Sequence, residues 1–292
     1  MNTNRCFTLT AALAALSLLA GCATHYRFAP DAGKGDYRIS ATEKELRVSK
    51  GRSSLTFYPN SAEARIDGRI KLNMPWSVKY ENGEFVIDAR LLDRIVEPLL
   101  SKQMLDTDTV VIDAGHGGVH PGAVGAVYKE KDLNLAVAKL LKAELEKRGL
   151  KVIMTRETDM TLELRDRVKI ADDSKSRLFI SVHHNAAHTR DARGYSVYAP
   201  RDCSHFPRES VVLAACVQRE LVKLPEVRDR GVNFADFRVL YSDMPALLVE
   251  LGFISNPVEE LIIGAPSRQK IEADAIAEGV VRYLRRTGEK RK

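Results

Sequence analysis

The chain has 292 residues, of which 45% are hydrophobic and 29% are charged. This composition excludes a disordered chain, and the length excludes a small disulfide-stapled domain while allowing one large domain or two modest ones. The 45 Lys and Arg residues exceed the 39 Asp and Glu residues, which permits contact with an anionic polymer or a membrane surface without requiring it. Because no stripe of basic residues is interleaved with aromatic ones, we expect no nucleic acid among the partners.

The N-terminal segment has the features of an export signal. Residues 7–20 are almost wholly apolar and follow Arg5. This run is shorter than the about 20 residues that a membrane-spanning helix needs, and it fits the apolar core of a signal peptide. It ends in Leu-Ala-Gly before Cys22, which resembles the lipobox of bacterial lipoproteins. The resemblance implies a lipoprotein signal peptide over residues 1–21 and lipidation of Cys22. An ordinary secretory signal with an incidental cysteine is the alternative.

The residue after the lipidation site bears on the location of the protein. Ala23, rather than Asp, follows Cys22. By analogy with enterobacterial lipoproteins, this favours a periplasmic protein that is lipid-anchored to the outer membrane. In a host with a single membrane, the same anchor implies a cell-surface lipoprotein. Export makes a disulfide between Cys203 and Cys216 possible, but Cys216 lies in an apolar run and is equally compatible with a buried thiol, so the pairing stays open.

The next part of the chain is predicted to contain a tether and a small domain. Residues 22–36 contain Gly, Pro and Asp without periodicity and are interpreted as the tether. Residues 37–100 are predicted to form a small strand-rich α+β domain that faintly resembles stalk domains of bacterial envelope proteins. Short alternating runs predict strands at 46–48, 54–57, 64–66, 70–72 and 85–87, with turns at 67–68 and 82–83 and one helix at 91–100. We find no chemistry in this domain.

From Thr109 onward, strands alternate with helices. Strands are predicted over 109–113, 151–155, 178–182, 195–198, 237–241 and 246–250, and helices over 131–148, 164–171, 209–224 and 267–286. This alternation predicts an α/β domain over residues 107–288, with a mostly parallel or mixed sheet and flanking helices.

Four side chains that can bind a metal or move protons fall at one edge of this predicted sheet. His116 comes directly after the first strand, His183 directly after the strand over 178–182, and Glu250 ends the last strand. Open α/β sheets bind ligands beyond the carboxyl ends of their strands. Glu130 opens the helix that follows a glycine-rich loop, and this loop can fold back so that Glu130 faces the same edge.

The residue types suit metal-dependent hydrolysis. Two histidines and a glutamate form a three-ligand set for catalytic zinc, which leaves a fourth position for water. A second carboxylate that is not a ligand can serve as general base. A single histidine after a strand is more often structural. The convergence of four such residues favours the functional interpretation.

The motifs that contain these residues closely resemble those of zinc-dependent N-acetylmuramoyl-L-alanine amidases of the bacterial cell-separation type. The matching runs are Asp113–Gly118, Pro121–Ala123, Glu130–Leu135, Ser181–Ala186, Arg230–Gly231 and Pro245–Asn256. The resemblance implies that His116, Glu130 and His183 bind zinc and that Glu250 is the catalytic carboxylate. It implies a peptidoglycan substrate, cleaved at the amide between N-acetylmuramic acid and the L-alanine of the stem peptide.

Three features of the sequence differ from the family pattern or have a role that the pattern does not define. His120 stands where an acidic residue usually precedes the Pro-Gly-Ala run. His184 directly follows a predicted ligand and is expected to point away from it, either lining the site or serving a structural role. Residues 199–208 leave no room for the long inhibitory helix that some members carry.

Two other functions remain compatible with these motifs. One is a zinc endopeptidase that cuts within the stem peptide, and the other is a non-catalytic peptidoglycan-binding lipoprotein. The presence of all three ligand residues and of Glu250 favours the enzyme. We expect the protein to act as a monomer.

Overall fold

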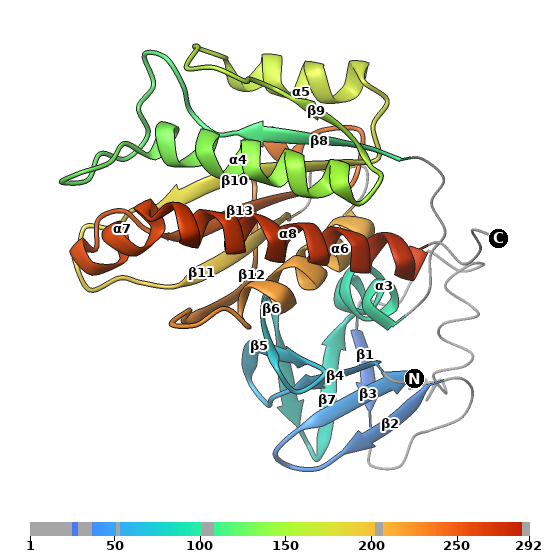
Figure 1. The fold of residues 1–292 in the computed structure, drawn as a ribbon. Helices are drawn as coiled ribbons and strands as arrows, with labels where there is room; N and C mark the ends of the chain where they lie inside the picture. Colours follow the sequence, from blue (N-terminus) through green and yellow to red (C-terminus); the bar gives the residue numbers. More distant parts are fainter. Residues whose placement is uncertain (1–24, 29–36, 51–52, 101–107, 202–206, 288–292) are drawn as a thin grey trace. The chain divides into compact units, whose positions relative to one another are not determined.

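The computed structural model describes residues 25–28, 37–50, 53–100, 108–201 and 207–287 (Figure 1). The expected signal peptide over residues 1–21, Cys22 and Cys203 therefore lie outside the described residues. The chain divides into two compact units, residues 1–101 and 102–292. None of the helices in the described ranges is both long and apolar enough to span a membrane.

The first unit is an antiparallel sheet followed by a short helical segment. Each neighbouring pair in the order β2-β3-β4-β5-β6-β7-β1 is antiparallel. The strands are β1 (His25–Phe28), β2 (Arg38–Ala41), β3 (Leu46–Lys50), β4 (Ser53–Phe57), β5 (Ser61–Ile66), β6 (Ile70–Glu81) and β7 (Glu84–Asp88). The helical segment consists of α2 (Ala89–Leu91), the π-helix η1 (Leu92–Val96) and α3 (Glu97–Leu100).

Alternating burial explains why these segments are strands. In β3, Leu46 and Val48 are buried whereas Arg47 between them is exposed, which is the pattern of a sheet with one face on the core. Both predicted turns are confirmed. Asp67 and Asn82 adopt φ angles of 52° and 55°, and each is followed by a glycine with positive φ, as a tight hairpin turn requires.

Two expectations for the first unit need correction. The tether expected over residues 22–36 contains β1, which pairs with β7. Its four residues are too few for a periodic signal, and the partner strand lies far along the chain. The single helix expected over 91–100 begins earlier, at Ala89, and contains a π-helical stretch.

The second unit confirms the predicted α/β fold. Its sheet has the order β12-β11-β13-β10-β8-β9. Strands β13, β10, β8 and β9 are parallel to one another, whereas β11 is antiparallel to β13 and parallel to β12. The strands are β8 (Thr109–Ala114), β9 (Lys151–Met154), β10 (Leu178–Asn185), β11 (Tyr195–Pro200), β12 (Asp229–Ala235) and β13 (Ala246–Phe253).

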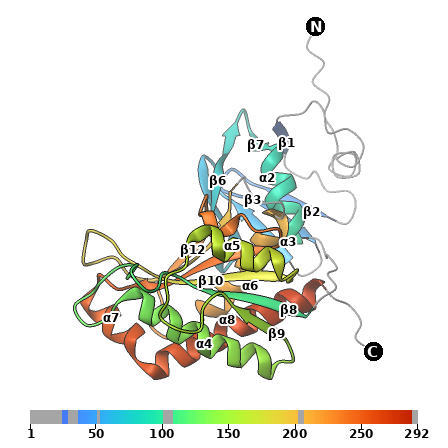
Figure 2. The same ribbon diagram turned by 90° about the horizontal axis from the view of Figure 1, so that it is seen from above.

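Helices cover both faces of this sheet. They are α4 (Glu130–Lys147), α5 (Leu164–Asp173), α6 (Pro207–Leu221), the 3₁₀ helix η2 (Arg238–Leu240), α7 (Pro257–Gly264) and α8 (Pro266–Thr287). Helices α4, α6 and α8 pack together on one face (Figure 1). On the other face, α5 and η2 share a buried apolar cluster with β8, β10 and β13, and Figure 2 shows α5 across the sheet from α4 and α8.

Three elements of the second unit differ from the sequence prediction. The strand expected over 237–241 is η2, where the neighbouring side chains of Val239 and Leu240 are both buried, so the segment does not alternate as a strand would. Strand β12 was not predicted, because its sequence Asp-Arg-Gly-Val-Asn-Phe-Ala carries little alternation. Helix α7 is too short for periodicity, although Asn256 caps it and Pro257 occupies its first turn.

Candidate metal centre

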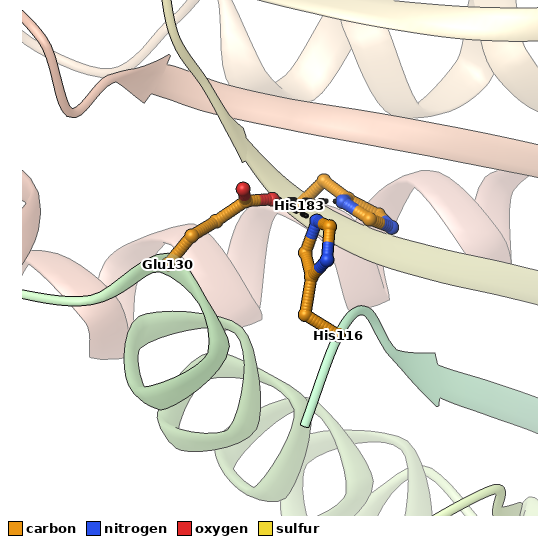
Figure 3. A group of neighbouring side chains, drawn as sticks. All are labelled: His116, Glu130 and His183. Atoms are coloured by element: carbon orange, nitrogen blue, oxygen red, sulfur yellow. Dashed lines mark hydrogen bonds and ion pairs between the residues drawn. The ribbon is translucent and has the colours of Figure 1, made fainter. Parts of the chain in front are cut away.

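Three predicted ligand residues converge at the carboxyl ends of β8 and β10. One potential ligand atom from each of His116, Glu130 and His183 lies within 4.8 Å of the others. Glu130 Oε1 is 2.8 Å from His183 Nδ1 and 3.2 Å from His116 Nε2 (Figure 3). The carboxylate is nearly buried, whereas both imidazoles are partly exposed.

The donor set fits a divalent metal ion. Two imidazole nitrogens and one carboxylate oxygen are typical ligands of zinc, and three ligands leave a position open for water or substrate. Burial by itself would raise the pKa of Glu130, but the hydrogen bonds and charges of His116 and His183 outweigh it and hold the pKa well below its ordinary value. Glu130 is therefore an anion, the form in which a carboxylate binds a cation.

The loop that carries His116 is held by two buried arginines. His116 has a φ of 60°, which is unusual for a residue with a side chain. Arg156 donates to the carbonyl oxygens of Ala114 and Gly115 at 2.8 and 2.9 Å. Arg167 donates to the carbonyl oxygens of Ala114 and His116 at 2.7 and 2.6 Å. These bonds fix three successive peptide groups and so stabilise the strained backbone.

Arg167 is in turn fixed by Asp113, the first residue of the glycine-rich motif. Its guanidinium lies 2.7 Å from Asp113 Oδ1, and both side chains are buried. Thr155 and Ser181 also donate to the Asp113 carboxylate. Burial would raise the pKa of Asp113, but Arg167 and the two hydroxyls lower it. Neither arginine was expected from the sequence, where the only signal is a charge placed directly after a predicted strand or inside a predicted helix.

Close packing around two glycines explains part of the motif. A Cβ atom at Gly115 would overlap the imidazole ring of His183. A Cβ atom at Gly122 would overlap the side chains of Glu130 and His116. These two glycines therefore let the backbone approach the candidate ligands closely.

Glu130 is placed by the loop that precedes it. As predicted, it is the first residue of α4. Its Oε2 atom accepts a hydrogen bond from the backbone N–H of Ala123 at 2.8 Å. Glu260 of α7 fixes the same loop by accepting from three successive backbone N–H groups, those of residues 126–128. Glu260 was not expected from the sequence, because its partners lie more than 130 residues away.

Neighbouring histidines of β10 have different surroundings. The strand continues to Asn185 rather than ending at residue 182, and its pairing with β13 is irregular between His183 and Asn185. His183 faces Glu130, whereas the Nδ1 atom of His184 lies 2.8 Å from Asn134 Oδ1 of α4. Burial lowers the pKa of His184 to about 3. Of the two roles left open for His184, the structure supports the structural one.

Glu250 lies one strand away from His183. Strand β13 continues beyond it to Phe253, and the register pairs Glu250 with His183 on one side and with Ser196 on the other. Glu250 Oε2 is buried and has no hydrogen-bond partner among the described residues. Burial and, to a smaller extent, the negative charge of Glu130 raise the pKa of Glu250. A buried carboxylate with a raised pKa beside a candidate metal centre suits proton transfer.

His120 is separate from this cluster. Its Nε2 atom lies 3.7 Å from Glu163 Oε1, and both side chains are more than half exposed. The group of ligand atoms around Glu130 does not include it. The departure from the family pattern at this position therefore leaves the candidate metal centre unchanged.

Residues 110–282 match the N-acetylmuramoyl-L-alanine amidase family designated Amidase_3. The chain belongs to this family. The matched residues lie within the second unit, which is thus an amidase unit with the α/β fold of that enzyme class. No part of the match falls in residues 1–101.

Similar proteins include an N-acetylmuramoyl-L-alanine amidase. The chain is 35% identical to the N-acetylmuramoyl-L-alanine amidase LytC of Bacillus subtilis over 179 residues, which are 61% of this chain and 36% of LytC. It is 39% identical to the uncharacterised protein YqiI of the same species over 180 residues, 61% of this chain and 86% of YqiI. The chain thus spans about a third of LytC and most of YqiI.

Solved structures show the same likeness. The catalytic domain of the amidase CwlV from Bacillus (Paenibacillus) polymyxa var. colistinus is 35% identical, with a TM-score of 0.57. An N-acetylmuramoyl-L-alanine amidase from Clostridium difficile 630 is 36% identical, with a TM-score of 0.58. These matches cover 61% and 62% of this chain and 98% of each solved chain.

Two further expectations concern the segment between β11 and α6. The strand ends at Pro200 and the helix begins at Pro207, so the amidase unit has no room there for a long inhibitory helix. Cys216 is buried in α6. Because Cys203 lies outside the described residues, its pairing with Cys216 stays open.

Proposed function

We propose that the protein hydrolyses the amide bond between N-acetylmuramic acid and the L-alanine of peptidoglycan stem peptides, with zinc held by His116, Glu130 and His183. The observation that supports this most is the convergence of these three donors beside the buried carboxylate of Glu250. It occurs in a chain that belongs to the amidase family and resembles amidases such as LytC.

Each ligand residue has a defined part in holding the metal. The two imidazoles would bind through a ring nitrogen, and the anionic carboxylate of Glu130 would offset part of the positive charge. When bound, zinc supplies Lewis acidity, which acidifies water and polarises an amide carbonyl. The arginines that fix the His116 loop keep the donors in place before the metal arrives.

Glu250 would move the protons of the reaction. Neighbouring strands lie about 4.8 Å apart, so the register partner of His183 reaches substrate held at the centre. Its carboxylate accepts a proton from the attacking water and delivers one to the leaving amine of L-alanine. The products are a muramic acid lactyl carboxylate and a peptide with a new amino terminus. The raised pKa of Glu250 favours the second transfer, because the carboxyl group stays protonated until the amine leaves.

Digestion of purified sacculi tests this function. The protein with zinc should release peptides that begin with L-alanine and leave glycan strands that lack stem peptides, as identified by mass spectrometry. The Glu250→Gln variant is the matched control. Cleavage between stem-peptide residues would instead identify an endopeptidase. Saturable binding to sacculi without any new termini would identify the non-catalytic lipoprotein.

We also propose that Cys22 is lipidated and that the anchor holds the amidase at the outer membrane, facing the peptidoglycan, for wall remodelling, daughter-cell separation or recycling. The support is the lipobox-like sequence and the short apolar run before it. In a host with one membrane, the anchor would place the protein on the cell surface.

Fractionation of cells at high salt tests the anchor. The Cys22→Ser variant should leave the membrane fraction and lose labelling by a palmitate analogue. Cys6→Ser is the matched control, since residue 6 lies within the segment that would be removed. Retention of Cys22→Ser in the membrane fraction, or an unlabelled wild-type protein, would contradict the assignment.

A further inference from the structure

Four exposed arginines lie at the same edge of the sheet as Glu250. Strands β11 and β12 are parallel to each other, and β11 is antiparallel to β13, so their first residues lie beside the last residues of β13. The register pairs Tyr195 with Leu251 on one side and with Asp229 on the other. The loop before β11 and the start of β12 carry the exposed residues Arg190, Arg193, Arg228 and Arg230.

Arg230 is oriented by its neighbours. The Cζ atom of its guanidinium lies 4.9 Å from the centre of the Phe253 ring, a distance at which a cation is attracted to an aromatic face. Its Nη1 atom donates to the carbonyl oxygen of Arg193 at 3.4 Å. Arg230 as a whole residue is exposed to solvent.

A buried carboxylate fixes the backbone at Phe253, the residue whose ring lies under the Arg230 guanidinium. Glu259 of α7 accepts hydrogen bonds from the backbone N–H groups of Phe253 and Gly194 at 2.7 and 2.9 Å. Asp229 accepts from Gly231 N and from the side chain of Gln218, which fixes the backbone on both sides of Arg230. An arginine that is oriented in advance loses less entropy when it binds a ligand.

The two segments that carry the four arginines have a surplus of one positive side chain. The two segments that carry the four arginines contain three acidic residues, Asp191, Glu226 and Asp229, and the last of these is engaged with Gln218. Burial raises the pKa of Tyr198 on β11, a hydrogen bond with Ser196 opposes this, and the charges of Glu250 and Arg230 raise and lower the pKa respectively.

The reach of a peptide matches this arrangement. Phe253 comes three residues after Glu250 and pairs with Asn185, two residues beyond His183. An extended peptide advances about 3.3–3.6 Å per residue. About three residues beyond the scissile amide therefore cover the offset from Glu250 to Phe253 along β13 together with the spacing of one strand. A stem peptide that leaves the centre toward β12 would bring a carboxylate to the guanidinium over Phe253.

We propose that Arg230 binds a free carboxylate of the stem peptide and so makes the enzyme prefer acidic over amidated stem peptides. This inference rests on the proposed amidase function and deepens it. A guanidinium pairs with a carboxylate through two parallel hydrogen bonds, which a neutral carboxamide cannot reproduce. Arg230 is thus a specificity-determining residue and takes no part in the proton transfers.

Soluble N-acetylmuramoyl peptides that differ in one group test the proposal. One substrate carries a carboxylate on the residue after L-alanine, the second a carboxamide there, and the third a carboxamide only at its C-terminus. The wild-type protein should show a kcat/KM about tenfold to a hundredfold higher for the first substrate than for whichever amidated substrate lacks the recognised carboxylate. The second and third substrates show which carboxylate that is.

Arg230→Gln should abolish this preference, mainly by raising KM for the substrate that carries the recognised carboxylate. Arg230→Lys should keep part of the preference, because it retains the charge but not the paired hydrogen bonds. The matched control is Arg238→Gln. Arg238 is also exposed and lies over an aromatic ring, 5.9 Å from that of Tyr241, but it follows the opposite end of β12. This variant should behave like the wild type.

Three results would overturn the proposal. The first is a wild-type enzyme with equal kcat/KM for the acidic and amidated substrates. The second is an Arg230→Gln variant that keeps the wild-type preference. The third is an Arg230→Gln variant whose kcat/KM falls equally for all three substrates and whose melting temperature is lowered. Calorimetric binding of the peptide products, with carboxylate or carboxamide, provides a readout that does not need hydrolysis. If the wild-type protein cleaves none of the substrates, the amidase function fails, and the product binding still decides the role of Arg230.

Discussion

The two units of the chain differ in where they place polar groups. In the first unit, the buried polar side chains among the described residues are Ser54 and Thr56 alone, and its ion pairs retain solvent exposure. The amidase unit buries several charged side chains, among them Asp113, Arg167 and Glu272. Burying a charge is costly unless it is paired and hydrogen-bonded. Asp113 and Arg167 form such a pair beside the candidate metal centre, and Glu272 forms another with Arg268 away from it.

Substituting the candidate ligands should have the largest effect, and it tests whether the chemistry is confined to the second unit. His116→Ala, Glu130→Ala and His183→Ala should each lower zinc content and activity together, because only three protein ligands hold the ion. Zinc analysis and hydrolysis of soluble muropeptides measure both. His184→Ala is the matched control and should keep its zinc while lowering the melting temperature, since it loses the contact with Asn134. If His184→Ala loses its zinc while His183→Ala keeps it, then His184 rather than His183 is the ligand.

Glu250→Gln should have the next largest effect. The carboxamide keeps the shape of the side chain but cannot accept the proton of water, and loss of a general base lowers rates by about 10²–10⁴-fold. Zinc content should stay at the wild-type level. Loss of zinc together with activity would make Glu250 a ligand instead.

Glu272→Gln should produce a smaller, pH-dependent change in stability. Glu272 is buried in α8, where burial raises its pKa to about 7 despite hydrogen bonds from Tyr195 and Arg268. The pKa of the folded chain thus exceeds the ordinary value of 4.5, and the folded state binds more protons. Stability should therefore fall as pH rises from about 4.5 toward about 7 and change little above that.

Thermal melts of chelator-treated protein between about pH 5 and about pH 8 measure this contribution. The wild-type protein should lose stability over the range, and Glu272→Gln should lose less. Equal slopes for the two proteins would show that Glu272 titrates as an ordinary carboxyl group. Activity at constant temperature should be similar for both, because Glu272 lies in α8 and contacts none of the candidate ligands.

Removal of the first unit should have the smallest effect on hydrolysis. A fragment that begins at Asp108 should fold, bind zinc and cleave soluble muropeptides within roughly twofold of the full chain, since compact units with their own core can fold alone. The solved CwlV catalytic domain, 98% of which is matched by this chain, supports this expectation. A strict need for residues 1–101, or for an activating partner, would show that the two units share the activity.

Much of the fold and of the candidate site could be predicted from local sequence. Alternating hydrophobicity and 3.6-residue periodicity are properties of single segments. They therefore identified strands β3, β8 and β13 and the long helices α4 and α8. His116, Glu130, His183 and Glu250 were found because each lies beside the end of a strand or helix within a specific motif. Their roles as ligands and general base remain predictions, and so do zinc and the lipid anchor.

The sequence by itself determined which residue types stand at the carboxyl edge of the sheet, because that depends on short-range periodicity. Only the tertiary structure decided that Arg156 and Arg167 fix the His116 loop, that Glu260 holds the loop before Glu130, and that β1 pairs with β7. These contacts join residues separated by about 40 to more than 130 positions. A hydrogen bond between residues so far apart along the chain leaves no pattern in the local sequence, since its geometry exists only after the sheet and helices have packed.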